Sequence, residues 1–337
     1  MGLIGYKYRF TTIAFILLLT GSRIFAAGPY FSNGGNWGTA GTWLITSCAG
    51  GGGAVPTNAD DVTICTGTVN INVSGTCRNL TISNGATLTF NTNGANLVVT
   101  GTLTVNGGVT GGKITYSANT SYTGTGTTCQ LQVSGNLSCT SPGSINMSKT
   151  PFKYGEIVFN TGTNSVVSGN GAITAYSITV GKTVSTATVD ITATAFTAGN
   201  SISLILNKGT FIWDNPQTLS DCYDDNVTTG LTVKSGVVLE CANGLMHICK
   251  NGQLTLNQGE LYIHGGHAYV GESVEGTDII YNSLGASVPE ILIDAAGAIL
   301  DVYGGINDNG AYTNAMNFQM SAGTLNLSVG PAGAGPK

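Results

Sequence analysis

Short runs in which apolar and polar residues alternate recur along most of this chain. Leu80-Thr81-Ile82 and Leu103-Thr104-Val105 are typical, and similar runs continue as far as Leu325-Asn326-Leu327. A period of two predicts strands with one buried face and one face in water. Gly and Asn stand at the breaks, where the backbone has to turn. Because a helical period of 3.6 residues is almost absent, the pattern predicts an all-β protein.

Two architectures accept strands of this kind. Antiparallel strands joined by tight hairpins would give β-sandwich domains. Three short strands per coil, with Gly and Asn at the corners, would give a right-handed parallel β-helix. The repeat is loose and runs without an interdomain linker from about Leu80 to Val329. We therefore predict a parallel β-helix with an N-terminal cap, and keep the β-sandwich as the alternative.

The first 27 residues have the pattern of a targeting signal. Lys7 and Arg9 precede an apolar run that is too short to span a bilayer, and small residues follow near Ala26. The predicted organisation is a signal peptide at 1–27, a cap module at 28–78, a parallel β-helix at 79–330 and a flexible tail at 331–337. A secreted or cell-surface protein is expected, with no transmembrane segment in the mature chain.

Charge is sparse and uneven. Only 9% of the 337 residues are charged, while 50 are Gly. Removing 1–27 takes three of the 12 basic residues and none of the 17 acidic ones, which leaves 9 − 17 = −8. A negative chain is not expected to bind nucleic acid. Of the 17 acids, 15 lie in 156–337, so the C-terminal half is where a cation would bind.

The region after the predicted signal carries a motif of its own. Trp37 and Trp43 precede Pro56, the pair Asp60-Asp61 and an alternating strand run; the remaining motif residues are Val62, Ile64, Gly67, Val69 and Ile71. This segment, over about 33–110, resembles the N-terminal part of G8-like modules and of exported bacterial surface proteins of the parallel β-helix type. The resemblance implies the fold and says little about activity.

All eight Cys lie beyond the predicted signal, and an even number in an exported chain favours disulfides. Zinc would need paired C-x-x-C spacings, which are missing. The local pairs Cys129 with Cys139 and Cys241 with Cys249 are the predicted bonds.

Three longer segments, 207–230, 265–290 and 303–317, interrupt the strand rhythm and mix aromatic with acidic residues. Ring faces pack on sugars while carboxylates and amides bind sugar hydroxyls. The predicted glycan-binding residues are Trp213, Tyr223, Tyr269, Tyr281 and Tyr303. We expect a non-enzymatic adhesion or glycan-binding scaffold whose partner is an extracellular polysaccharide or a cell-surface glycan.

Calcium is the one cofactor that the sequence suggests. Asp221, Asp224 and Asp225 cluster in DCYDDN, and a hard cation prefers several such oxygens, although an EF-hand spacing is missing. His264 and His267 form the motif HGGH, which could share a metal but lacks the helix that fixes such a pair in H-E-x-x-H.

Two alternative functions remain. Many β-helix proteins are polysaccharide lyases or glycoside hydrolases, but the mature chain has a single Arg, Arg78, and neither the galacturonase-like motif set nor G-x-S-x-G. These absences argue against an enzyme. Outward Thr81, Thr89, Thr104 and Thr115 could form a flat ladder that binds ice, although Val98 interrupts it.

Overall fold

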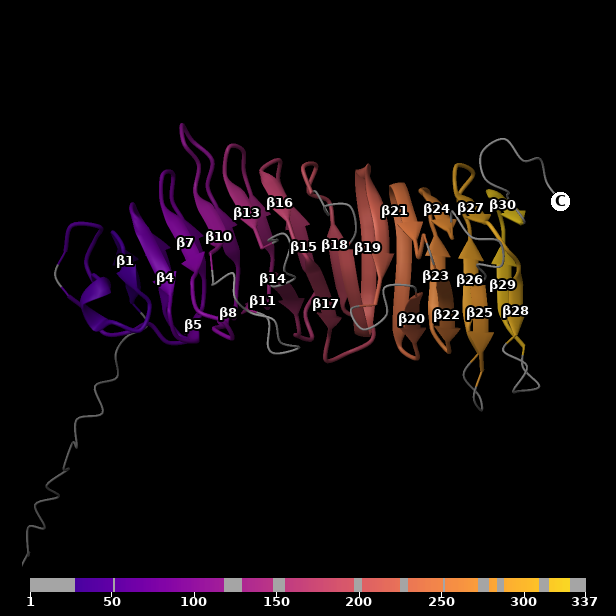
Figure 1. The fold of residues 1–337 in the computed structure, drawn as a ribbon, viewed down its shortest axis with the longest axis horizontal. Helices are drawn as coiled ribbons and strands as arrows, with labels where there is room; N and C mark the ends of the chain where they lie inside the picture. The colour runs from indigo at the N-terminus through magenta and orange to yellow at the C-terminus, as the bar shows by residue number, and fades with distance from the viewer. Residues whose placement is uncertain are drawn as a thin grey trace, which may run out of the picture.

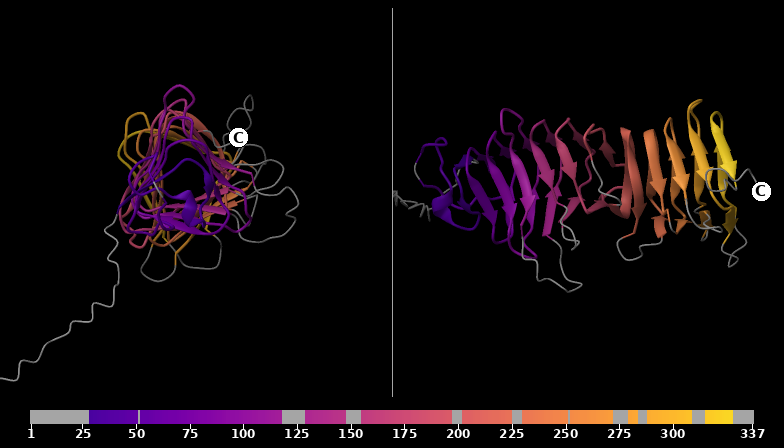
Figure 2. Two further views of the ribbon diagram at one scale, coloured as in Figure 1. Left: turned by 90° about the vertical axis from the view of Figure 1, so that its left-hand side faces the viewer. Right: turned by 45° about the horizontal axis from the view of Figure 1, so that its top comes forward.

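A computed structural model describes residues 28–50, 52–117, 129–147, 155–196, 202–224, 230–250, 252–271, 279–283, 288–308 and 315–327. These residues form a parallel β-solenoid. Figure 1 shows the strands stacked along one long axis, and the end-on view in Figure 2 shows a roughly triangular outline. In each coil the chain visits three faces in a fixed order, which we call the first, second and third face.

The first face is a continuous ladder of parallel strands. It contains β1 (Pro29–Ser32), β3 (Asp61–Ile64), β6 (Leu80–Ile82), β9 (Leu103–Val105), β12 (Leu137–Cys139), β15 (Ser165–Ser168), β18 (Thr188–Ile191), the middle of β19 (Ile202–Tyr223), the start of β21 (Val237–Ile248), β23 (Glu260–Ile263), β26 (Glu290–Ile293) and β29 (Asn317–Met320).

The second face follows the first in each coil. It contains β2 (Gly35–Asn36), β4 (Thr68–Ile71), β7 (Thr87–Phe90), β10 (Lys113–Tyr116), β13 (Ser144–Asn146), β16 (Ala172–Thr174), the ends of β19 and β21, β24 (His267–Val270), β27 (Ile299–Val302) and β30 (Thr324–Leu327).

The third face closes each coil. It contains β5 (Gly75–Cys77), β8 (Leu97–Val99), β11 (Cys129–Val133), β14 (Gly155–Phe159), β17 (Ser177–Gly181), the start of β19, and then β20 (Gly230–Lys234), β22 (Gln253–Asn257), β25 (Ile279–Asn282) and β28 (Ile306–Asp308). All pairings between these strands are parallel, and the antiparallel contacts of the described residues are isolated bridges such as Phe31 with Leu44. The β-sandwich alternative is therefore wrong. The right-handed sense of the solenoid stays a prediction.

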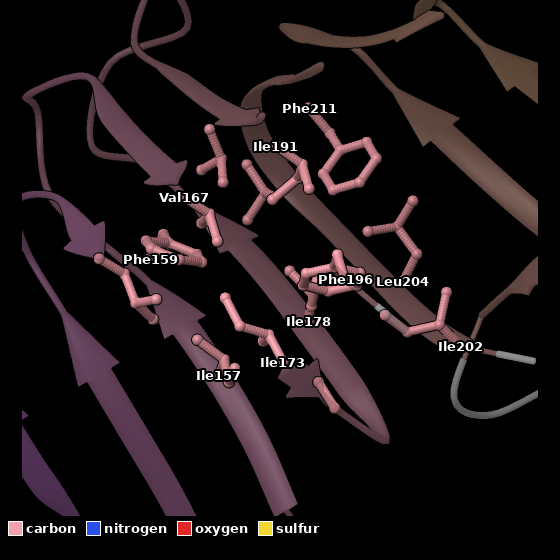
Figure 3. Close-up of a cluster of buried hydrophobic side chains, with 14 of the residues drawn as sticks. Ile157, Phe159, Val167, Ile173, Ile178, Ile191, Phe196, Ile202, Leu204 and Phe211 are labelled. Atoms are coloured by element: carbon pink, nitrogen blue, oxygen red, sulfur yellow. The ribbon is translucent and has the colours of Figure 1, made fainter. Parts of the chain in front are cut away.

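Alternation along each strand builds the core. Inward residues of successive coils stack in register, for example Ile157 on Ile178 in the third face and Val167 on Ile191 in the first. Figure 3 shows side chains of the three faces converging in the interior. Burying one large aliphatic side chain stabilises by about 1.5 to 3 kcal/mol before conformational entropy is counted. The predicted role of the Leu, Ile and Val positions is confirmed.

The two ends of the solenoid differ. At the N-terminal end, Trp37 and Trp43 are fully buried, their ring centroids lie 4.8 Å apart, and the Trp43 indole N–H donates to the Trp37 carbonyl oxygen at 2.9 Å. A short 3-10 helix, η1 (Ala40–Thr42), lies between them. At the C-terminal end, Phe318 and Leu327 continue buried columns yet are 39% and 46% exposed.

The two predicted disulfides are not formed in the structure. A single disulfide joins Cys48 to Cys65 in the cap, with Cα atoms 6.0 Å apart, and the predicted cysteines are free thiols: Cys129, Cys139, Cys241 and Cys249. Closeness in sequence does not predict the disulfide partners here, because consecutive strands lie on different faces of the solenoid. Cys129 lies on the third face and Cys139 on the first.

Candidate functional site

The motif HGGH forms one corner of the solenoid. His264 follows β23 on the first face, and His267 begins β24 on the second. The glycines between them permit the close turn, since a Cβ atom on Gly266 would lie 2.4 Å from the Cys241 sulfur. The corner therefore directs its two imidazoles to different faces.

Each imidazole pairs with an aspartate of the following coil. His264 Nδ1 lies 2.9 Å from Asp294 Oδ1, an ion-pair contact without good hydrogen-bond alignment. His267 Nε2 lies 2.9 Å from Asp301 Oδ2 within hydrogen-bond geometry, and its carboxylate partner is largely buried. The two histidines thus face separate carboxylates. Within the described ranges, no three His, Cys, Asp or Glu side chains gather as metal ligands would.

A row of rings stands on the second face around His267. Tyr269 stacks on His247 of the preceding coil with ring centroids 5.1 Å apart, and on His267 at 4.0 Å. The row continues into polar groups, because Asp301 also accepts a hydrogen bond from the Asn326 side-chain amide at 2.7 Å. Strand register fixes this order over four coils. We call His247, Tyr269, His267, Asp301 and Asn326 the ring row.

Acidic groups gather on the neighbouring first face. Asp190 and Glu240 occupy the same outward column two coils apart, with Ile212 between them. Burial raises the pKa of both carboxyls, and nearby Asp214 adds to the rise in each case. His264 partly offsets the rise in the pKa of Glu240. These carboxyls are therefore proton-bound over a wider pH range than ordinary surface acids.

The remaining predicted glycan-binding residues do not join the ring row. Trp213 is 0% exposed; it packs edge-on against Phe196 and donates its indole N–H to the Gln217 carbonyl oxygen at 3.2 Å. Tyr223 is buried, and Tyr281 packs against the hydrophobic core from the third face. Tyr303 is half-buried after β27. Trp213 and Tyr223 are thus core residues rather than contact residues.

The acidic run DCYDDN is tied to its neighbours. Asp221 Oδ1 accepts the backbone N–H of Lys250 at 3.0 Å, and the Asp224 N–H donates to the Gly230 carbonyl oxygen at 2.7 Å. Asp225 lies outside the described residues. The Asp221 contact joins adjacent coils, and the Asp224 contact links the end of β19 to the start of β20, while calcium binding there stays a prediction.

The four threonines of the ice-binding alternative occupy two faces. Thr81 and Thr104 pair on the first face, whereas Thr89 and Thr115 pair on the second, where their hydroxyls lie 3.0 Å apart. A single flat ladder of these four side chains is therefore not formed.

Sequence reasoning did not assign His247, Asp301 or Asn326 to a site. A signal was available. Aligning the runs LMHI, HAYV, ILDV and TLNL by their apolar second and fourth positions brings His247, Tyr269, Asp301 and Asn326 into one outward column.

Comparison with known proteins gives no guide to function: no family model, no curated protein and no solved structure matches the chain. The resemblance to G8-like modules therefore remains unconfirmed. Helices that could cross a membrane, long and apolar, are not found in the described ranges.

Proposed function

We propose that this chain is an exported, non-enzymatic scaffold that binds glycans along the second face of its C-terminal half. The ring row carries the proposal. Tyr269 and the two histidines are half-buried side chains on this face, and the exposed Asn326 amide can bind sugar hydroxyls. Asp301 is largely buried and positions His267 and Asn326 through its two carboxylate oxygens. Successive coils lie about 4.8 Å apart, so the ring row presents side chains at regular intervals along the sheet. Such a row suits an extended polymer that runs along it.

Polysaccharide binding by the mature chain tests the proposal. A panel of neutral, acidic and amino-sugar polysaccharides would be passed over immobilised protein, and the tightest binder taken forward. Tyr269→Ala should weaken that binding by about tenfold, the loss expected for roughly 1.4 kcal/mol of ring contact. Tyr262→Ala removes an outward tyrosine from the first face and is the matched control.

Equal losses in the two variants would count against the ring row as the binding surface. Binding to no member of the panel would count against a glycan scaffold altogether.

Hydrolysis of a glycan is the second candidate, and the acidic first face favours it. A glycosidase needs one carboxyl that stays protonated near neutral pH and a second that acts as base or nucleophile. The pKa values of Asp190 and Glu240 are raised, which is the direction that the first role requires. Release of shorter sugars from the bound polysaccharide, abolished by Glu240→Gln, would replace the scaffold proposal with an enzyme.

A further inference from the structure

Two cysteines of successive coils lie next to each other in the core. Cys222 lies near the end of β19 on the second face, and Cys249 lies on the next coil, one position beyond the residue opposite Cys222. The Cys249 N–H donates to the Cys222 carbonyl oxygen at 3.0 Å, and Cys222 is the register partner of Ile248. Neighbouring strands lie about 4.8 Å apart and successive residues about 3.3 Å along a strand, so a pair offset by one residue still falls within the range of roughly 4.4 to 6.8 Å between Cα atoms that a disulfide bridges.

The backbone turns both thiols inward. Ile248 already points into the core, so an ordinary strand would direct Cys249 outward. Cys249 instead adopts a φ of 52°, in the left-handed region, and is only 2% exposed. Cys222 is 0% exposed, and both side chains belong to the same hydrophobic cluster. A non-glycine residue at positive φ is uncommon, so this turn is a specific feature of the corner.

The electrostatic surroundings of Cys222 agree with this placement. Burial raises the pKa of the Cys222 thiol well above its usual value, and the nearby Cys249 is the next largest cause. Cys241 contributes less to that pKa and lies on the first face, in register with Trp213. Cys249 is therefore the nearer partner for Cys222.

We propose that Cys222 and Cys249 form a disulfide that joins one coil of the solenoid to the next. The structure describes the dithiol form. The oxidant is an external disulfide such as oxidised glutathione: one thiolate attacks it, one external thiol leaves, and the second cysteine displaces the other. The new S–S bond thus forms as two protons leave, and the two electrons reduce the external disulfide to two thiols.

Peptide mapping after oxidative refolding tests this bond. The reduced chain would be refolded in glutathione buffers of rising oxidised fraction until Cys48 and Cys65 are joined, which serves as the internal reference. Free thiols are then alkylated in denaturant, and the chain is cleaved by trypsin and by cyanogen bromide. Trypsin cuts after Lys208, Lys234 and Lys250, and cyanogen bromide cuts after Met246, so Cys241 and Cys249 are separated.

The expected product is peptide 209–234 linked to peptide 247–250, with 8 − 4 = 4 alkylated cysteines. Cys241→Ser should leave this link intact, whereas Cys249→Ser should leave Cys222 alkylated. Recovery of Cys222 and Cys249 as alkylated peptides, once the reference bond has formed, would overturn the proposal. So would a link from Cys222 to peptide 235–246. Wild-type mapping decides the question even if a variant does not fold.

Discussion

At the scale of single residues, the direction of a side chain from its strand decides its role. Trp213 and Tyr269 are both aromatic residues of irregular segments in the sequence. Trp213 stands at an inward position beside Phe196, whereas Tyr269 stands at an outward position between two imidazoles. Inward aromatics stabilise the core, and outward ones are available to a ligand.

Replacement of Trp213 should therefore affect stability rather than binding. Trp213→Ala removes a fully buried ring, and the expected loss is about 3 to 5 kcal/mol in the free energy of unfolding. Ile212→Ala, at the adjacent outward position, is the matched control and should cost less. Denaturant unfolding of both variants measures the difference. Similar losses would show that Trp213 is not the core residue that its burial indicates.

Glu240 should make the protein less stable as pH rises. Its pKa is raised in the folded state, chiefly by burial; His264 opposes this rise, and Asp190, Asp294 and Asp214 each add a smaller rise. The folded chain then binds more protons at this site than the unfolded chain, so stability falls as pH increases from the usual Glu pKa through the raised value.

Glu240→Gln removes this titration. Thermal midpoints of the wild type and the variant should differ least at about pH 4, and the stability of the wild type relative to the variant should fall as pH rises above the usual Glu pKa. A difference between the two midpoints that does not change from pH 4 to pH 7 would contradict the raised pKa.

At the scale of elements, the corners decide which side chains meet. The alternating runs allowed the strands, the parallel solenoid and the buried positions to be predicted, because a period of two is a local property. The neighbours of an outward side chain were not predictable in the same way. Coils differ in length, so the pairing of His267 with Asp301, 34 positions on, depends on the register of complete coils.

Replacing the corner glycine Gly266 should lower the stability of the protein. Gly266→Ala would bring a Cβ atom against the Cys241 sulfur and the Asn243 backbone, and overpacking of this kind costs about 1 to 3 kcal/mol. Gly297→Ala is the control, since its Cβ would meet nothing closer than 4.0 Å. The thermal unfolding midpoint of Gly266→Ala should be lower than that of Gly297→Ala. Equal midpoints would mean that the corner is packed less tightly than its contacts indicate.

At the scale of the whole molecule, stacked coils contact only their neighbours. Stability in such a solenoid is close to a sum of local terms, and opening begins where a coil has a neighbour on one side only. The N-terminal end is covered by Trp37 and Trp43, which are buried. The coil of β29 and β30 has a paired coil on one side in the described residues, and its apolar side chains are partly exposed.

Hydrogen exchange should therefore be asymmetric along the solenoid. Backbone amides of β29 and β30 should show protection at least about tenfold lower than those of β1 and β3, because opening the last coil exposes little additional apolar surface. The coils around β18 and β19 should exchange slowest, since each has neighbours on both sides. Exchange measured by mass spectrometry on peptides from these strands gives the comparison directly. Equal protection at both ends would mean that Phe318 and Leu327 are covered in solution, and that the terminal coil is held by contacts other than those of β26 and β27.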